Sequence, residues 1–185
     1  DLLGAGLGCL AAVAALYWLD GAAALFVCAG FFTLGGALYA GVSRQGRVLG
    51  CLTVALFIAA PWGGAVLDFQ PTASKQLAVG LARPGARVLH SQWSPVNRVD
   101  LYGVPGARGG MWGGFGLNPA YKGPIPRVLD IQYDGHNGSN VFQVKTLRSL
   151  RMLEQHILRT PYLLLEDPRV LVIGVGGGID ILNAL

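Results

Sequence analysis

The stretch RVLVIGVGGGIDILNAL, residues 169–185, decides how the C-terminal part of the chain is expected to fold. It contains the apolar run 170–173, which is bounded by Asp167 and Pro168 on one side and by glycines on the other. Such a run is typical of a strand buried on both faces of a parallel sheet. Residues 179–185 then return to helix-compatible side chains. The pattern therefore predicts a strand, a glycine turn and a helix.

Three glycines of this turn, Gly174, Gly176 and Gly178, form a GxGxG pattern. Glycines permit tight turning and close backbone approach, and the amides at the start of the following helix offer donors to a polar ligand. The dinucleotide fingerprint GxGxxG would need glycine where the chain has Ile179. A membrane span is also disfavoured, because Asp180 interrupts the run. The pattern instead favours a loop that binds a cofactor of the S-adenosylmethionine type.

The composition divides the chain into an apolar N-terminal part and a more charged remainder. Hydrophobic residues make up 52% of the chain and charged residues 13%, which departs from the average soluble domain. The charged residues before position 68 are few: Asp1, Asp20, Arg44 and Arg47. Three apolar runs, 2–19, 22–41 and 48–67, each have about 20 residues, the length that crosses a hydrocarbon core. We therefore expect a multi-pass integral membrane protein with about three spans here.

The charges and cysteines narrow the classes of function. No acidic or basic residue lies within the three runs, which argues against an ion or proton path through them. The net charge is +4, but the basic residues are scattered singly, so we do not expect nucleic-acid binding. Cys9, Cys28 and Cys51 have no ligand spacing, and we expect no metal site. No nucleophilic triad is identifiable, and the catalytic residues stay unknown.

The middle of the chain predicts a small β region behind a polar connector. Residues 74–82 of the connector suit a short amphipathic helix, and turn-forming residues at 94–97 predict a first β-hairpin. A second strand pair is expected to turn within 134–140. The glycine- and proline-rich segment 104–126 should lack regular structure. Its aromatic side chains either line a pocket or pack the loop onto the domain: Trp112, Phe115 and Tyr121.

A helix is expected over 146–159, where apolar side chains form a helical stripe that Pro161 terminates. The expected fold is thus a membrane α-helical part, a small β-hairpin region, and the start of a Rossmann-like α/β domain. The corresponding boundaries are 1–67 for the transmembrane helices, 68–87 for the connector, 88–145 for the β region with its loop, and 146–185 for the truncated cofactor domain.

Together with the elements expected before it, the segment PRVLVIGVGGGID resembles the spermidine synthase (polyamine aminopropyltransferase) family. The helix segment RSLRMLEQHILRTPYLLL and the β-hairpins before it support the resemblance, which covers about residues 88–185. The chain is most similar to the membrane-embedded spermidine-synthase-like proteins, in which hydrophobic spans precede the domain. Many ordinary methyltransferases carry an acidic residue two places before the first glycine. This chain has Val172 there, which favours the synthase-like branch.

The resemblance implies a membrane-anchored transferase of polyamine biosynthesis. Its cosubstrate would be S-adenosylmethionine or decarboxylated S-adenosylmethionine, without a metal, and an aminopropyl or methyl group would pass to an amine. Gly174, Gly176 and Gly178 carry over as cofactor-binding residues. The synthases place an aspartate inside the glycine run, whereas here Asp180 follows Ile179, and Asp180 is carried over as the acidic member.

The same resemblance supplies candidates in the β region by position alone: Gln132, Tyr133 and Asp134. The family's catalytic aspartate loop would lie beyond Leu185, so we expect this chain to be a fragment of a longer protein. Expected partners are the lipid bilayer and a small-molecule amine, with no nucleic acid, and a homo-oligomer is left open. Because the cofactor pool is cytosolic, the α/β domain should face the cytoplasm. A catalytically inactive membrane scaffold or sensor that keeps the fold is the alternative.

Overall fold

The structure, a computed structural model, describes residues 2–110 and 116–185 and divides into two compact units. The helical unit comprises Asp1–Gln70 and Gln92–Arg98, and the sheet unit comprises Pro71–Ser91 and Val99–Leu185. The helices of the first unit are α1 (Leu2–Trp18), α2 (Gly21–Ala40), α3 (Arg44–Ala59), the 3₁₀ helix η1 (Ala60–Trp62) and α4 (Gly63–Val66).

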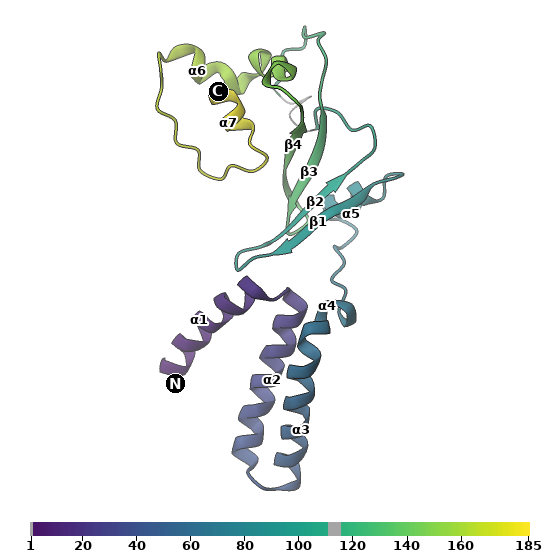
Figure 1. The fold of residues 1–185 in the computed structure, drawn as a ribbon, viewed down its shortest axis with the longest axis vertical. Coiled ribbons are helices and arrows are strands. Elements are labelled where there is room, and N and C mark those ends of the chain that lie inside the picture. Colours follow the sequence, from purple (N-terminus) through teal and green to yellow (C-terminus); the bar gives the residue numbers. More distant parts are fainter. Residues whose placement is uncertain (1, 111–115) are drawn as a thin grey trace. The chain divides into compact units, whose positions relative to one another are not determined.

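Helices α2 and α3 pack side by side as an antiparallel pair (Figure 1). Each begins at a polar N-cap, since the Asp20 carboxylate accepts a hydrogen bond from the Ala23 amide at 2.6 Å and the Ser43 hydroxyl caps α3. Between the helices, the hydroxyl oxygens of Thr33 and Thr53 lie 2.9 Å apart in a hydrogen bond. Small and hydroxyl-bearing residues at this contact are typical of helix pairs that associate in lipid.

Two segments of the helical unit, Gly21–Ala40 and Arg44–Val66, are long and apolar enough to cross a membrane. Only 22% and 17% of their most apolar windows are buried within the structure, so their apolar side chains mostly face outward. Helix α1 has 17 residues and is shorter than the run predicted for a first span. By length and composition, two helices rather than three meet the requirement for a span.

The contact between α4 and α2 provides a test of the helical unit. A Cβ added at Gly63 would lie 2.7 Å from the amide nitrogen of Ala23, and backbone cannot move aside as a side chain can. We expect Gly63→Ala to lower the free energy of unfolding by about 1–3 kcal/mol. Gly50→Ala is the matched control, because nothing lies within 4 Å of its Cβ position. Unfolding followed by circular dichroism in detergent compares the two, and equal stabilities would contradict this packing.

The sheet unit contains a four-stranded antiparallel sheet in the order β1-β2-β3-β4. Its elements are α5 (Gln76–Leu81), β1 (Arg87–Trp93), β2 (Arg98–Gly103), β3 (Arg127–Tyr133), β4 (Asn137–Gln143), the 3₁₀ helices η2 (Leu147–Gln155) and η3 (Ile157–Arg159), α6 (Thr160–Leu164) and α7 (Ile179–Ala184). The tip of the β1–β2 hairpin, Gln92–Arg98, belongs to the helical unit. Both predicted hairpins and the short connector helix are confirmed.

The β3–β4 turn follows from its sequence, Asp134-Gly135. Both residues have positive φ, 49° and 72°, which Asp and Gly tolerate, and the loop between the paired residues Tyr133 and Asn137 has three residues. The turn is therefore tighter than the 134–140 span expected for it. Helix α5 is tied to this turn, since the Leu77 amide donates to the Gly135 carbonyl at 2.9 Å and Lys75 Nζ donates to the Asp134 carbonyl at 2.7 Å.

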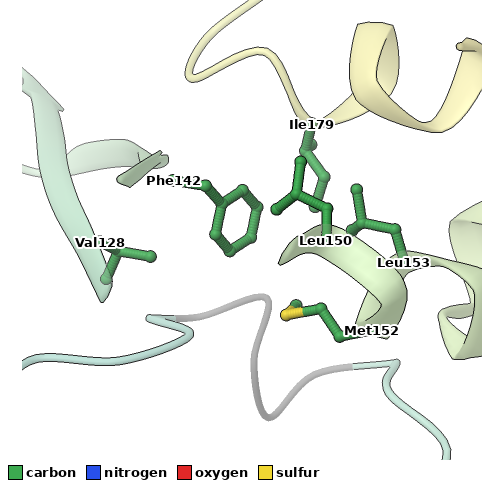
Figure 2. Close-up of a cluster of buried hydrophobic side chains, with 6 residues drawn as sticks. All are labelled: Val128, Phe142, Leu150, Met152, Leu153 and Ile179. Carbon is green, nitrogen blue, oxygen red and sulfur yellow. The ribbon is translucent and has the colours of Figure 1, made fainter. Parts of the chain in front are cut away.

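One hydrophobic cluster joins the sheet to the C-terminal elements (Figure 2). Phe142 of β4 lies between Val128 of β3 and Leu150 of η2, and Ile179 of α7 approaches the same cluster. The cluster consists of Val128, Phe142, Leu150, Met152, Leu153 and Ile179. Tyr121 packs against it, so this aromatic of the glycine-rich loop serves packing. Trp112 and Phe115 lie outside the described residues.

The helix predicted over 146–159 is wrong as an α-helix. The segment forms 3₁₀ turns with a break at Leu150, whose φ and ψ are −103° and 22°. In a 3₁₀ turn residues i and i+3 lie on the same side, which lets Leu150 and Leu153 both enter the core. Pro161 does not end a helix but lies in the first turn of α6, where its missing amide costs nothing.

The strand predicted over 170–173 is absent, and this segment lies outside every helix and strand of the described residues. Leu171 and Ile173 are 84% and 89% exposed. A parallel strand needs neighbouring strands for its backbone hydrogen bonds, and the described sheet is an antiparallel meander that offers none in that direction. The Rossmann-like domain is therefore not seen in this structure.

Helix α7 supplies a matched pair of isoleucines for a test of the core. Ile179 is 3% exposed in the cluster, whereas Ile181 is 40% exposed on the same helix. We expect Ile179→Ala to lower the free energy of unfolding of the sheet unit by about 2–4 kcal/mol, and Ile181→Ala by less than about 1 kcal/mol. Urea denaturation of the detergent-solubilised protein measures both. Similar losses would mean that α7 does not dock through Ile179.

Candidate functional site

The inner face of the sheet changes from apolar to polar along strand β3. Because side chains alternate across a strand, Val128, Asp130 and Gln132 share one face. Val128 pairs with Phe142 in the hydrophobic cluster, whereas the cross-strand neighbours of Asp130 are polar. Asp130 pairs with Tyr102 of β2 and with Asn140 of β4. One end of this face therefore builds the core and the other end builds a polar surface.

Helix α5 lies over the polar end and turns it into a cleft of about 760 Å³. Tyr102 is 6% exposed and packs beneath the helix, where a Cβ at Gly80 would lie 2.4 Å from the Tyr102 hydroxyl oxygen. The glycine at this position thus lets α5 approach the sheet. We call this hollow the polar cleft, and its main polar lining is Arg83, Tyr102, Asp130, Gln132, His136 and Asn140.

Gln132 carries a buried hydrogen-bond acceptor without a partner among the described residues. Its side chain is 6% exposed, and its Oε1 is buried without a hydrogen-bond partner in the described part of the chain. An unsatisfied buried acceptor costs about 1–3 kcal/mol, so such an atom calls for an explanation. The residue opposite is Gly138, where a Cβ would lie 2.5 Å from Gln132 Nε2. Glycine at position 138 therefore leaves the space that the side-chain amide of Gln132 occupies.

Asp130 is the carboxyl group of the cleft. Burial raises its pKa above the ordinary value of 3.8, against the opposing effects of a hydrogen bond from Asn140 Nδ2 to Asp130 Oδ1 and of the Arg83 charge. Burial also raises the pKa of Tyr102, with a further contribution from Asp130 and an opposing one from Arg83. The three groups interact electrostatically within one cleft. Perturbed titratable groups that converge in a concavity are typical of binding sites.

The predicted glycine run lies against strand β4 beside this cleft. The Gly177 amide donates to Ser139 Oγ at 3.1 Å, and a Cβ at Gly177 would lie 1.8 Å from the Asn140 carbonyl oxygen. Ser139 and Asn140 also line the polar cleft. Gly174, Gly176 and Gly178 have positive φ of 74°, 53° and 88°, which glycine adopts without strain. The GxGxG spacing therefore places a glycine at every second residue of the turn, where the backbone has positive φ.

The other predicted site residues take different places. Asp180 is half-buried in the first turn of α7. Of the three candidates chosen by position, Gln132 enters the cleft. Tyr133 alternates to the other face of β3, and Asp134 is exposed in the turn. Gln132 of β3 pairs with Gly138 of β4, and the glycine run contacts the next two residues of β4. The structure does not place Tyr133 or Asp134 in the cleft.

Sequence reasoning missed Asp130 and Tyr102 as members of the site. A signal was available, because Asp130 and Gln132 alternate with apolar residues along a predicted strand, and this places two polar groups on one face. The pairing of Tyr102 with Asp130 depends on the strand register, which the sequence alone does not specify. His136 directly follows the Asp134-Gly135 pair, and the β3–β4 turn brings it to the cleft rim.

Within the described residues no group of three or more His, Cys, Asp or Glu side chains is placed to hold a metal ion. The free cysteines Cys9, Cys28 and Cys51 are exposed on the helices. Comparison of the chain with protein-family models, with curated proteins and with solved structures finds no match in any of the three. The function is therefore inferred from the residues of the site.

The raised pKa of Asp130 has a consequence for stability. In the folded protein its proton is held more tightly than in the unfolded chain, so this proton stabilises the fold fully below about pH 3.8. That contribution is lost as the pH rises through the raised pKa. At pH 7 Asp130→Asn should therefore raise the melting temperature, because the amide can still accept from Asn140 without a buried charge.

Melting curves recorded between pH 3 and pH 8 test this expectation. Asp134→Asn is the matched control, since Asp134 is exposed and asparagine also tolerates its positive φ. The stability that Asp130→Asn gains over the wild type should be largest near pH 7 and should shrink toward pH 3, whereas the control should show no such trend. A lower melting temperature for Asp130→Asn at pH 7 would show that the carboxylate is needed for the fold itself.

Proposed function

We propose that this protein is a membrane-anchored, spermidine-synthase-like transferase that binds S-adenosylmethionine or its decarboxylated form and transfers an aminopropyl or methyl group to an amine. The single observation that carries the proposal is the buried, unpartnered Oε1 of Gln132 in a polar cleft that shares Ser139 and Asn140 with the glycine run. A cleft of about 760 Å³ lies within the usual range for small-molecule sites.

The cleft residues fit a polar, cationic ligand. Gln132 Oε1 can accept a hydrogen bond from an ammonium or a primary amine, because it has no partner in the described structure. Asp130 supplies a negative charge on the same face when ionised. A cation in the cleft would favour that ionised form and lower the pKa of Asp130 back toward its ordinary value. Ligand binding would thus offset part of the cost of burying the carboxylate.

The chemistry of the proposal needs little more than positioning. The bound sulfonium compound supplies an activated carbon: the amine forms the new C–N bond, the C–S bond breaks, and its electron pair leaves with the thioether. This chain's residues would hold the amine and its partner in line, and the proton that the amine loses would pass to a carboxylate. The catalytic base stays unassigned, because Asp130 is itself hydrogen-bonded to Asn140.

A Rossmann-like fold for the C-terminal part of the chain is also part of this proposal. Residues 146–185 would be the first part of a Rossmann-like α/β domain, and 170–173 would become its first parallel strand when neighbouring parallel strands pair with it. In support, the segment presents Leu171 and Ile173 almost fully to solvent immediately before the glycine turn. An apolar segment exposed in this way is typical of a strand without its partners.

The membrane placement is also proposed. Helices α2 and α3 would cross the bilayer as part of a multi-pass protein, with the cofactor domain in the cytoplasm, where S-adenosylmethionine is made and used. An antiparallel pair puts the α2–α3 loop and the first turn of α3, with Arg44 and Arg47, on the opposite side. Lys75, Arg83 and Arg87 follow the second span and place more basic residues on the domain side.

A catalytically inactive membrane scaffold or sensor is the second candidate. It is favoured by the packing of Gly177, because close approach to the Asn140 carbonyl explains this glycine without any ligand. The position of Asp180, after rather than within the glycine run, points the same way. A scaffold would keep the glycine turn as a structural joint between β4 and α7, and its cleft would bind neither sulfonium compound.

Titration of the detergent-solubilised protein tests the two candidates. S-adenosylmethionine and its decarboxylated analogue are each titrated by calorimetry, alone and with a linear diamine. We expect at least one sulfonium compound to bind, and Gln132→Leu to weaken binding of a sulfonium compound or the amine by about 5- to 100-fold, as for the loss of one buried hydrogen bond.

Gln143→Leu is the matched control, because it makes the same change at an exposed position on β4 outside the polar cleft. It should bind as the wild type does. Gln132→Leu should also retain or gain stability, since it removes an unsatisfied buried acceptor. If the wild-type protein binds neither sulfonium compound, the transferase proposal fails and the scaffold is the better account.

A further inference from the structure

Three aromatic side chains of the helical unit lie near the beginning of α2. Tyr17 and Trp18 end α1, with their ring centroids 6.0 Å apart, and Trp62 ends η1 immediately before Gly63, which contacts α2 at Ala23. Trp18 and Trp62 are 79% and 61% exposed. Exposed tryptophan and tyrosine at one end of apolar helices are typical of the boundary between lipid and water.

The tip of the β1–β2 hairpin joins this aromatic end. A Cβ at Gly21, the first residue of α2, would lie 2.9 Å from Trp93 Cη2, so the glycine leaves room for the indole ring. Trp93 also packs edge-on against Phe69, with ring centroids 6.1 Å apart. Arg98 lies over the same indole, 5.7 Å from its centroid, and donates to the Phe69 carbonyl at 2.9 Å. Two aromatics and one cation are thus fixed beside the start of α2.

The backbone N–H groups of the tip are satisfied without water. The Ser94 amide donates to the Asn97 carbonyl at 2.9 Å, and the amides of Val96 and Asn97 both donate to Ser94 Oγ at 3.3 and 3.1 Å. Pro95 has no amide to satisfy. Every amide from 94 to 97 is therefore bonded internally or absent, which removes the main cost of placing a loop near hydrocarbon. The side chain that this turn presents outward is Val96, 87% exposed.

We propose that the hairpin tip, residues 93–98, is a membrane-interface anchor that lies in the headgroup layer of the bilayer crossed by α2 and α3. The inference rests on the proposed membrane placement and not on any enzymatic activity. Trp93 would sit at the depth of the other interfacial aromatics, and Val96 would reach the upper acyl region. The Arg98 guanidinium, which lies over the indole ring, would place its positive charge at the level of the lipid phosphates. The partner is the lipid surface itself.

A label at Val96 tests this anchor in the full protein. Cys9, Cys28 and Cys51 are replaced by alanine, Val96→Cys is labelled with the environment-sensitive dye NBD, and the protein is reconstituted into phosphatidylcholine–phosphatidylglycerol vesicles. We expect a blue shift of the emission, loss of intensity with a shallow spin-labelled lipid, and protection from iodide. The control is the same label at Lys122→Cys, an exposed loop position of the sheet unit, which should stay accessible to iodide.

Each outcome decides the proposal. Iodide quenching at position 96 without quenching by the spin-labelled lipid would overturn it, and equal lipid quenching at 96 and 122 would overturn the specific role of the tip. Flotation of the vesicles is measured in parallel, and protein that does not float with lipid refutes the membrane placement together with the anchor. Since no sulfonium compound is present, failure here is distinguishable from failure of the transferase proposal.

Discussion

The two-residue alternation along strand β3 is the constraint on which the sheet unit depends. It places Val128, Asp130 and Gln132 on one face, so a single strand contributes both to the hydrophobic cluster and to the polar cleft. A shift of the register by one residue would move all three side chains to the other face. The Asp134-Gly135 turn fixes that register, and α5 is bonded to the same turn. The geometry of the cleft and the packing of the core are therefore set together.

Glycine in the C-terminal turn serves two separable purposes. Gly177 is needed for close approach to β4, whereas Gly174 and Gly178 have open space around their Cβ positions and are needed for positive φ. The first purpose is structural and already satisfied in this chain. The second shapes the turn, because a side chain at either position would have space but not the backbone conformation. The glycine-rich run 174–178 does not by itself distinguish these purposes, but the contacts of each glycine do.

Local signals in the sequence predicted the hairpins and the connector helix, because the turn residues and the period-two alternation act over a few neighbours. They failed for 146–159 and for 170–173, where the outcome depends on distant partners. Leu150 and Leu153 follow the surface of the sheet rather than an ideal helix. The segment 170–173 lacks the parallel neighbours that its apolar run requires. The site was predictable in part: Gln132 came from a family resemblance, whereas Tyr102 and Asp130 meet only through the register.

The polar cleft and the apolar helices affect the stability of the chain in different ways. Gln132 is buried and Asp130 is half-buried at a cost that the sheet core must offset, and the outward-facing side chains of α2 and α3 contribute no burial within the structure. A bilayer would remove that apolar surface from water and stabilise the helical pair independently of the cleft. The proposed membrane placement and an unsatisfied acceptor in the cleft are then compatible, because burial of the helices in lipid does not depend on the sheet. Spans stabilised in this way would leave the cleft free to retain an unsatisfied Gln132.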